Sequence, residues 1–221
     1  MTDPRFKGVY GKDVQIGPQD RALLIRRGLQ LSIITVIWNV VEGIVAVASG
    51  IFAGSVALIG FGVDSFIETA SAVVVGWRFS REIGNRSREQ AEKAEELAAR
   101  LAGALLLALA AYLLVESGRR LLGYGREPAP STIGIVLTFV SLIVMPVLGW
   151  IKLRVAGRLA SKALRADSYE TIACALMSAT TLAGLVVNAA LGWWWADPLA
   201  ALVLVPLIVR EGLEGLRGDP D

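Results

Sequence analysis

The sequence contains no histidine and only one cysteine among its 221 residues. The lack of histidine removes the commonest transition-metal ligand and the side chain that most readily titrates near neutral pH. Because Cys174 is alone, no internal disulfide can form, and cysteine usage does not define a redox compartment. A formal net charge of only +2 argues against a nucleic-acid partner. No nucleophile–base pair or metal-hydrolase motif is present, so we do not expect an enzyme.

Polar surface stretches are also scarce, because 54% of the residues are hydrophobic and they occur in long runs. Several runs approach the ~20 residues that cross ~30 Å of hydrocarbon. The sequence therefore predicts an all-α integral membrane protein in a lipid bilayer, a bundle of six transmembrane helices. The predicted spans are residues 29–51, 55–77, 101–117, 132–151, 166–191 and 198–209, the last with a polar extension. The charged stretch at 80–100 is expected to be either a solvated helix or a helical extension.

The last apolar region, residues 171–209, is too long for one span, because as a single helix it would measure ~58 Å. Trp193, Trp194 and Trp195 form an aromatic cluster typical of a membrane interface. Asp197 followed by Pro198 is the pattern of a helix N-cap with proline at the first helical position. We therefore expect the chain to turn here and a short sixth helix to follow.

Lysine and arginine predict the orientation and the division of the chain. All but three of the 22 basic residues fall on one side of the predicted spans, and the exceptions are Arg119, Arg120 and Arg126. The positive-inside rule then places both termini in the cytosol of a multi-pass cell-membrane protein. The expected parts are a polar N-terminal tail at 1–27, a transmembrane domain at 28–215 and a short C-terminal tail at 216–221.

Acidic residues inside the predicted spans are the main functional signal. An acid at the bilayer centre costs several kcal/mol, so it is retained for a partner or for an ion pathway. We expect no lysine or arginine at comparable depth, which leaves a cation from outside as the natural partner. The five acids within or at the edge of the spans are Glu42, Asp64, Glu68, Asp167 and Glu170.

Two pairs of these positions have the spacing of one helical turn. Asp64 and Glu68 are four residues apart on the second predicted helix, and Glu170 and Cys174 are four apart on the fifth. Glu68 and Cys174 each lie ~12–14 Å below the expected cytosolic surface, on helices that run in opposite directions. If the helices pack side by side, four donors can surround one tetrahedral divalent ion.

The other candidates have simpler alternative explanations. Glu42, one turn after Asn39, is either a secondary ligand or a protonated acid that hydrogen-bonds a neighbouring helix. Asp167 is either a secondary ligand or a residue that caps the fifth helix and complements its dipole. Cys174 is either a ligand or a small hydrophobic residue.

Three stretches resemble motifs of the cation diffusion facilitator (cation efflux) family. Residues 54–70, GSVALIGFGVDSFIETA, resemble the second-helix motif, and Asp64 and Glu68 occupy its two ligand positions. Residues 161–174, SKALRADSYETIAC, resemble the fifth-helix motif Ala-Asp-x-x-His-x-x-x-Asp, with Glu170 in place of His and Cys174 in place of Asp. Residues 195–198, WADP, resemble the Trp-x-Asp-Pro that opens the sixth helix.

The resemblance implies a homodimeric six-helix exporter that moves Zn²⁺ or a related divalent ion out of the cytosol in exchange for protons. It also implies a form without the C-terminal cytosolic metal-binding domain that the family usually adds. No permanently bound cofactor is expected, since the metal is the substrate. The mixed oxygen and sulfur donors favour Zn²⁺, with Cd²⁺, Co²⁺, Fe²⁺ and Mn²⁺ as alternatives.

Two rival functions use the same residues. A membrane scaffold or assembly protein with a vestigial transporter fold would keep the acids without needing them. A proton or organic-cation carrier would need the acids but not a metal, and competition by Zn²⁺ would separate it from a metal transporter.

Overall fold

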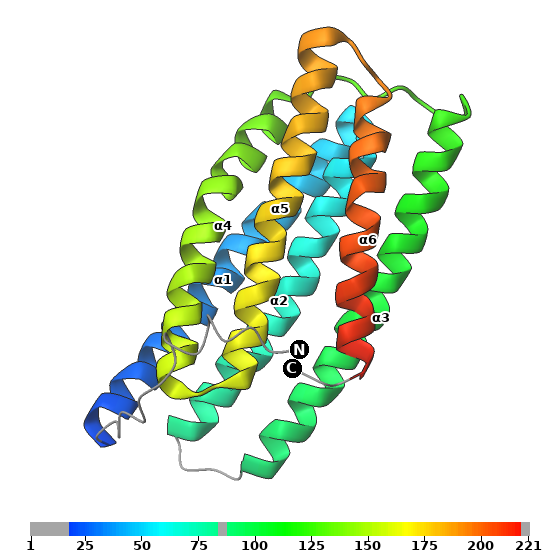
Figure 1. Ribbon diagram of the computed structural model, residues 1–221. Coiled ribbons are helices and arrows are strands. Elements are labelled where there is room, and N and C mark those ends of the chain that lie inside the picture. Colours follow the sequence, from blue (N-terminus) through cyan, green and yellow to red (C-terminus); the bar gives the residue numbers. More distant parts are fainter. Residues whose placement is uncertain (1–17, 84–87, 218–221) are drawn as a thin grey trace, which may run out of the picture.

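The computed structural model describes residues 18–83 and 88–217, and within them the chain forms six α-helices. Their bounds are α1 Pro18–Ala53, α2 Val56–Ile83, α3 Arg88–Leu121, α4 Thr132–Leu159, α5 Lys162–Leu191 and α6 Ala196–Arg217. The helices lie side by side and alternate in direction, with α1 and α4 at one edge and α3 and α6 at the other (Figure 1). We call the end where α1 begins and α6 ends the basal end; it is the lower end in Figure 1.

Each predicted span corresponds to one of these helices, and the sixth predicted helix is confirmed as α6. All six are longer than predicted. A helix of 28 residues, such as α2 or α4, measures ~42 Å and therefore extends beyond the ~30 Å hydrocarbon core. The apolar runs in the sequence locate the membrane-embedded part of each helix, but not the helix ends.

The beginning of α1 corrects the predicted N-terminal tail. Residues 18–27, which we expected to belong to the tail, are helical, and Leu24 and Ile25 are buried against neighbouring helices. Residues 1–17 and 218–221, which make up the rest of the predicted tails, lie outside the described residues. Residues 84–87 of the predicted charged helix also lie outside them; α2 continues to Ile83 and α3 begins at Arg88 on either side.

Local signals explain the turn between α4 and α5. Ser161 caps α5 by accepting a hydrogen bond from the backbone N–H of Leu164 at 3.3 Å. Ala160, just before it, adopts the left-handed conformation at φ 50°, and its N–H contacts the carbonyl of Ala156, which ends α4. This turn has only two residues, Ala160 and Ser161, between the helices, so α4 and α5 run antiparallel along most of their length.

The start of α6 differs from the sequence prediction. The helix begins at Ala196, so Asp197 is inside its first turn and is not its N-cap. The Asp197 carboxylate instead accepts hydrogen bonds from the Ser55 hydroxyl and, at 2.8 Å, from the Val56 backbone N–H. Asp197 therefore caps α2 rather than α6, because the first turn of α2 presents unpaired N–H groups to it.

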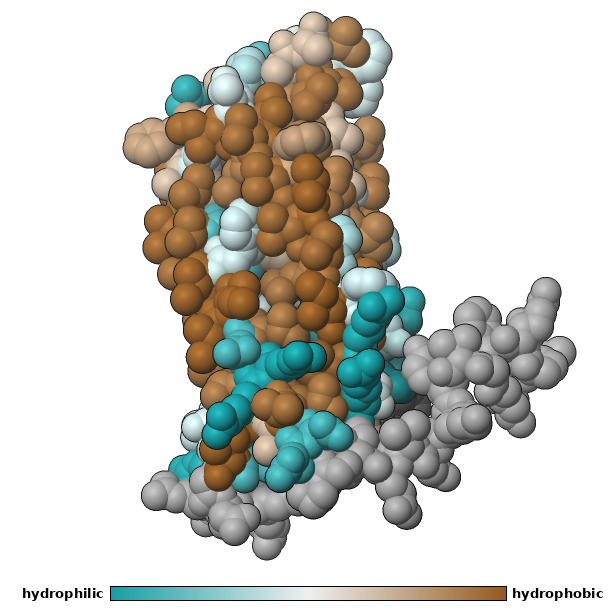
Figure 2. Space-filling view, turned by 90° about the vertical axis from the view of Figure 1, so that its left-hand side faces the viewer, coloured by the Kyte–Doolittle hydropathy of each residue, from teal (hydrophilic) through white to brown (hydrophobic). Residues whose placement is uncertain are grey.

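The outer surface is apolar, as a lipid environment requires. Phe52 is 81% exposed, and many other large apolar side chains of α1, α2 and α4 face outward. On the face where α1 and α4 lie, an apolar belt covers most of the height and hydrophilic side chains gather beneath it (Figure 2). Four helices, α1, α2, α4 and α5, are long and apolar enough by themselves to cross a membrane. The described chain is thus a six-helix membrane bundle.

Candidate metal centre

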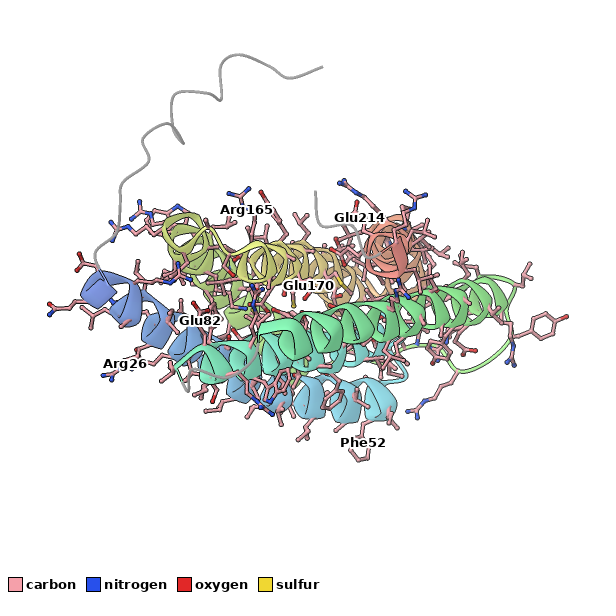
Figure 3. The ribbon with its side chains drawn as sticks, turned by 90° about the horizontal axis from the view of Figure 1, so that it is seen from below. Arg26, Phe52, Glu82, Arg165, Glu170 and Glu214 are labelled. Carbon is pink, nitrogen blue, oxygen red and sulfur yellow. The ribbon has the colours of Figure 1, made fainter. Side chains whose placement is uncertain are left out.

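Helices α2 and α5 form the centre of the bundle and carry the four predicted ligands. Helix α2 contacts α1, α3, α5 and α6, so its inward face is enclosed on several sides. Asp64, Glu68 and Cys174 are 7%, 5% and 1% exposed. Glu170 lies in the interior seen from the basal end, whereas Arg165 of the same helix points away from the bundle (Figure 3). The expected side-by-side packing of these two helices is confirmed.

The acidic side chains of this centre are close enough to interact electrostatically. Asp64 experiences the charges of Glu68, Glu170 and Glu42, and Cys174 experiences those of Glu68, Glu42 and Asp64. The four predicted positions therefore share one region of the interior. Across residues 18–83 and 88–217, however, no three acidic or thiol side chains converge closely enough to hold a metal ion.

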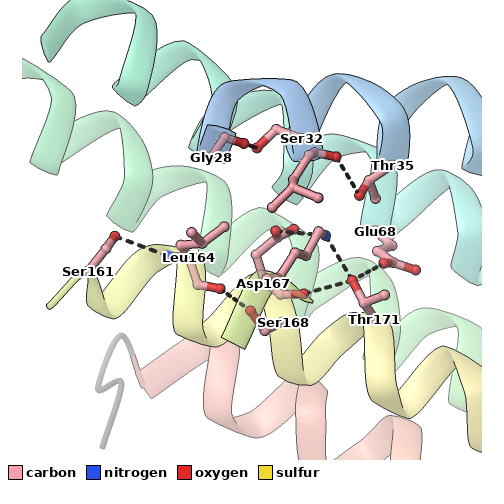
Figure 4. A network of polar contacts seen from close by, with 11 residues as sticks. Gly28, Ser32, Thr35, Glu68, Ser161, Leu164, Asp167, Ser168 and Thr171 are labelled. Carbon is pink, nitrogen blue, oxygen red and sulfur yellow. Dashed lines mark hydrogen bonds and ion pairs between the residues drawn. The ribbon is translucent and has the colours of Figure 1, made fainter. Parts of the chain in front are cut away.

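A polar network links α2, α4 and α5 at the basal side of this centre (Figure 4). The Thr171 hydroxyl donates to Glu68 Oε1 at 2.6 Å, and Lys152 Nζ donates to Thr171 Oγ1 at 2.8 Å. The same ammonium lies 2.8 Å from Asp167 Oδ2. Lys152, Asp167 and Thr171 are each at most 1% exposed. The Thr171 hydroxyl therefore bridges the buried ammonium of Lys152 and the carboxylate of Glu68, a predicted metal ligand.

Lys152 corrects the expectation that no lysine or arginine lies at the depth of the acids. The predicted fourth span ended at Ile151, but α4 continues to Leu159, so Lys152 is inside the bundle. Gly149, one turn earlier, lets α4 approach α5 closely: a Cβ there would lie 2.8 Å from Ile172 Cγ1 and 3.3 Å from the Ser168 carbonyl oxygen. This approach brings the ammonium of Lys152 against the first turns of α5.

Asp167 is a partner of Lys152 and does not cap α5. The N-cap of α5 is Ser161, six positions earlier, so the capping explanation for Asp167 is wrong. A buried carboxylate is costly unless it is paired, and the ammonium supplies the pairing. This ion pair occupies Asp167 Oδ2, while Oδ1 is buried without a hydrogen bond, so Asp167 keeps one oxygen that a cation could bind.

Glu42 of α1 lies in a second polar group, on the other side of Cys174. Its carboxylate accepts hydrogen bonds from the hydroxyls of Ser65, at 3.1 Å, and Ser141, and from the Trp38 indole N–H at 3.3 Å. Cys174 Sγ lies 4.0 Å from Glu42 Oε2. Because both oxygens of Glu42 have donors, the interhelical hydrogen-bond role accounts for this residue without a metal.

Other polar atoms of the centre are buried without partners. Within the described part of the chain, Glu68 Oε2, Glu170 Oε2 and both amide atoms of Asn39 form no hydrogen bond. Asn39 is fully buried and lies beside Glu68. Since most buried polar atoms in native proteins are satisfied, unpaired oxygens on two facing helices indicate a place for a cation or water.

Glu211 of α6 also faces this centre and was missed in the sequence. It is partly buried and interacts electrostatically with Asp64, Glu68 and Glu170. The signal was present, because Glu211 continues the buried stripe of Ala201, Leu204 and Ile208 at helical spacing. The prediction ended the sixth span at Val209 and so did not include it.

Six membrane helices with carboxylates and a thiol on their inner faces are the features of an ion-transporting membrane protein. The comparison with known sequences gives the family. Residues 32–217 match the cation efflux transmembrane domain, so the chain belongs to the cation efflux family, which consists of transporters and not of enzymes. This confirms the resemblance inferred from the second-helix, fifth-helix and WADP motifs.

Three curated relatives illustrate the similarity. The cation-efflux pump FieF of Shewanella oneidensis is 27% identical over 170 residues, which cover 74% of this chain and 56% of the relative. The uncharacterized transporter sll1263 of Synechocystis is 32% identical over 174 residues, covering 74% and 54%. A cadmium, cobalt and zinc/H(+)-K(+) antiporter of Bacillus subtilis is 27% identical over 119 residues, covering 53% and 37%. The chain spans about half the length of the first two relatives.

Proposed function

We propose that this protein exports a divalent metal cation, Zn²⁺ or a similar ion, in exchange for protons, and that the ion passes between α2 and α5. Asp64, Glu68, Glu170 and Cys174 are its proposed ligands. Membership of the cation efflux family supports cation transport, and relatives whose names include zinc and proton exchange support the finer assignment. The ion is a transported substrate, so no resident cofactor is part of the proposal.

The observation that carries this proposal is the unpaired oxygen of Glu68. One oxygen accepts from Thr171, while Oε2 is buried without a partner and belongs to a residue only 5% exposed. Glu170 Oε2 on the facing helix is unpaired as well. Two unpaired carboxylate oxygens on adjacent helices are suited to bind a hard or borderline divalent ion, or protons when the ion is absent.

Charge balance supports the exchange of metal for protons. Three carboxylates and a thiolate would carry −4 around a +2 ion if all four ligands were ionised. Lys152 does not remove the surplus, because its charge is matched by Asp167. The metal-free centre should therefore hold protons, which metal binding releases.

The ligands are near one another but do not converge, and this bears on the mechanism. A transporter needs a state that binds the ion and a state that releases it, and a loosely arranged ligand set suits release. We propose that a small displacement of α2 relative to α5 brings the four donors together. Glu68 would follow such a displacement through Thr171, since that hydroxyl links it to α5.

Metal preference depends on Cys174 in this proposal. With its soft sulfur, the ligand set favours Zn²⁺, Cd²⁺ or Co²⁺; with oxygen ligands alone it would favour Mn²⁺ or Fe²⁺. Asn39 and Glu42 of α1 are secondary candidates, and Asn39 is the better placed of the two because its amide lies beside the Glu68 carboxyl. The proposed orientation has both termini in the cytosol, and the proposed functional unit is a homodimer.

The test is metal uptake by the purified protein in proteoliposomes, across a panel of divalent ions and with an imposed pH gradient. The native chain should accumulate Zn²⁺ when the gradient supplies exchangeable protons, and Asp64→Ala should abolish the uptake. Glu82→Gln is a matched control, because Glu82 is an exposed acid at the end of α2 that pairs with Arg21 at 2.6 Å. It should transport normally.

Each rival function gives a different result in this assay. Uptake that ignores the pH gradient would contradict proton exchange. A scaffold protein predicts no uptake by the native chain, and normal function with improved folding in the variant carrying Asp64→Asn and Glu170→Gln. A proton or organic-cation carrier predicts proton flux that Zn²⁺ does not inhibit.

A further inference from the structure

A groove lies between α1 and α4 at the basal end. Its volume is about 450 Å³, and its apolar lining residues are Leu24, Ile151 and Val155. Arg27, Arg154, Arg158 and Trp150 complete the lining. A cavity of this size is in the range that accommodates a small organic ligand.

Three arginines from two helices line this groove. Arg154 and Arg158 are one turn apart on α4, and Trp150 is one turn before them, so the three share a face of the helix. Arg27 approaches from α1. The guanidinium of Arg154 lies 3.4 Å from the centroid of the Trp150 ring, which holds it flat beside the opening.

Among residues 18–83 and 88–217, no acid balances the arginine charges in the groove. None of Arg27, Arg154 and Arg158 forms an ion pair with an acidic residue that the structure describes. Arg21, at the same end of the bundle, does have such a partner in Glu82. Arg158 lies in the last turn of α4, where the helix dipole favours a cation, but the dipole does not account for three cations around one groove.

The position of the groove relative to the apolar belt indicates which class of ligand fits it. Hydrophilic side chains gather directly beneath the apolar belt on the α1 and α4 face, which is the level of lipid phosphate groups (Figure 2). Above the groove, the same two helices present exposed apolar side chains, including Ile34 and Ile37 of α1 and Ile143 and Val147 of α4. A ligand with an anionic head and apolar chains would match both surfaces at once.

We propose that this groove is a binding site for an anionic phospholipid, with the headgroup phosphate on the three arginines and the acyl chains along α1 and α4. Basic pockets between transmembrane helices are suited to such headgroups, since each cation near the membrane surface attracts the anionic phosphate. The proposal is independent of the transported ion. A lipid bound here joins α1 to α4, two helices that both contact the central pair.

The test compares lipid binding by the detergent-solubilised full chain, measured by native mass spectrometry. Phosphatidylglycerol is the probe, phosphatidylcholine with the same acyl chains is the uncharged comparison, and glycerol phosphate supplies the headgroup without chains. The native protein should retain phosphatidylglycerol in preference to both. The variant with Arg27→Gln, Arg154→Gln and Arg158→Gln should bind it at least tenfold more weakly.

Arg81→Gln is the matched control for this test. Arg81 is also a basal arginine over a tryptophan, 4.9 Å from the centroid of the Trp77 ring, but it lies on α2 outside the groove. It should retain full lipid binding. The variant with Arg27→Lys, Arg154→Lys and Arg158→Lys keeps the three charges and should bind phosphatidylglycerol in part. Such binding would show that the glutamine variant has lost a charged site and not its fold.

Three results would overturn the proposal. Equal retention of phosphatidylcholine would show an apolar surface without headgroup recognition. Equal affinity for glycerol phosphate would show a site for a free anion. A loss in Arg81→Gln as large as in the triple variant would show general attraction between basal arginines and anionic lipid.

Discussion

Two buried carboxylates on or beside α2, those of Asp197 and Glu68, differ in how their oxygens are used. Asp197 is fully buried, and its oxygens accept from the Ser55 hydroxyl and the Val56 N–H, so it fastens the start of α6 to the start of α2. Glu68 is almost as buried, yet one of its oxygens has no partner. Satisfied acceptors are typical of a structural acid, whereas unsatisfied ones are typical of a site that awaits a ligand.

The surroundings of the two acids differ in the same way. Around Asp197, nearby polar groups also have partners: Asn188 donates to the Pro128 carbonyl at 2.9 Å, and Arg120 donates to the Gly54 carbonyl. Near Glu68, by contrast, Lys152 and Asp167 form an ion pair, and the amide of Asn39 forms no hydrogen bond. Burial alone therefore does not separate the two acids, whereas the hydrogen bonds at their carboxylate oxygens do.

The largest expected effect on stability is that of replacing Lys152, the buried cation. Lys152→Met leaves the Asp167 carboxylate buried without its partner, and breaking a buried ion pair in this way costs about 3–5 kcal/mol. We expect a marked fall in the thermal unfolding temperature of the detergent-solubilised protein. The double variant with Lys152→Met and Asp167→Asn removes both charges and should recover most of the loss. A single variant no less stable than the double one would contradict the ion pair.

The next effect is that of removing the structural acid. Asp197→Ala leaves the Ser55 hydroxyl and the Val56 N–H without an acceptor, and each unsatisfied buried group costs about 1–3 kcal/mol. We expect lower thermal stability, with the metal dissociation constant unchanged in protein that remains folded. Asp197→Asn keeps one acceptor oxygen and should lose less. A weakened metal affinity in folded Asp197→Ala would show that the two regions are not separate.

The membrane fold could be predicted from the sequence because its signal is local. A run of about twenty apolar residues is typical of a transmembrane helix, so the spans in α1, α2, α4 and α5 were recognisable without knowledge of their neighbours. The sixth was inferred instead from the excess length of residues 171–209. Helix ends were less predictable, because beyond the hydrocarbon core the apolar signal stops while the helix continues. Lys152 shows the consequence: it stands one residue past the predicted span, yet it is fully buried.

The polar contacts join residues that lie far apart in the sequence, so the sequence alone does not show which residues form them. Asp197 and Ser55 are 142 positions apart, and Glu68 and Thr171 are 103 apart, so no local pattern joins them. The regular spacing of Asp64 with Glu68 and of Glu170 with Cys174 places each pair on one helix face, and their binding of one ion stays a prediction. The spacing could not predict that Thr171 and Lys152 would stand beside the acids, because that depends on the close approach of α4 at Gly149.

The smallest expected effect on stability, and the most direct test of the comparison, is that of Glu68→Gln. The substitution keeps the side-chain shape and the acceptor for Thr171, so we expect the free energy of unfolding to change less than in Asp197→Ala. Metal binding should weaken about tenfold or more, equivalent to about 1.4 kcal/mol, because a charged ligand is lost. Isothermal titration with Zn²⁺ and a thermal melt of the same sample measure both quantities. If Glu68→Gln lowered the stability as much as Asp197→Ala does and left the metal affinity unchanged, Glu68 would be a structural acid. The difference drawn between Glu68 and Asp197 would then be wrong.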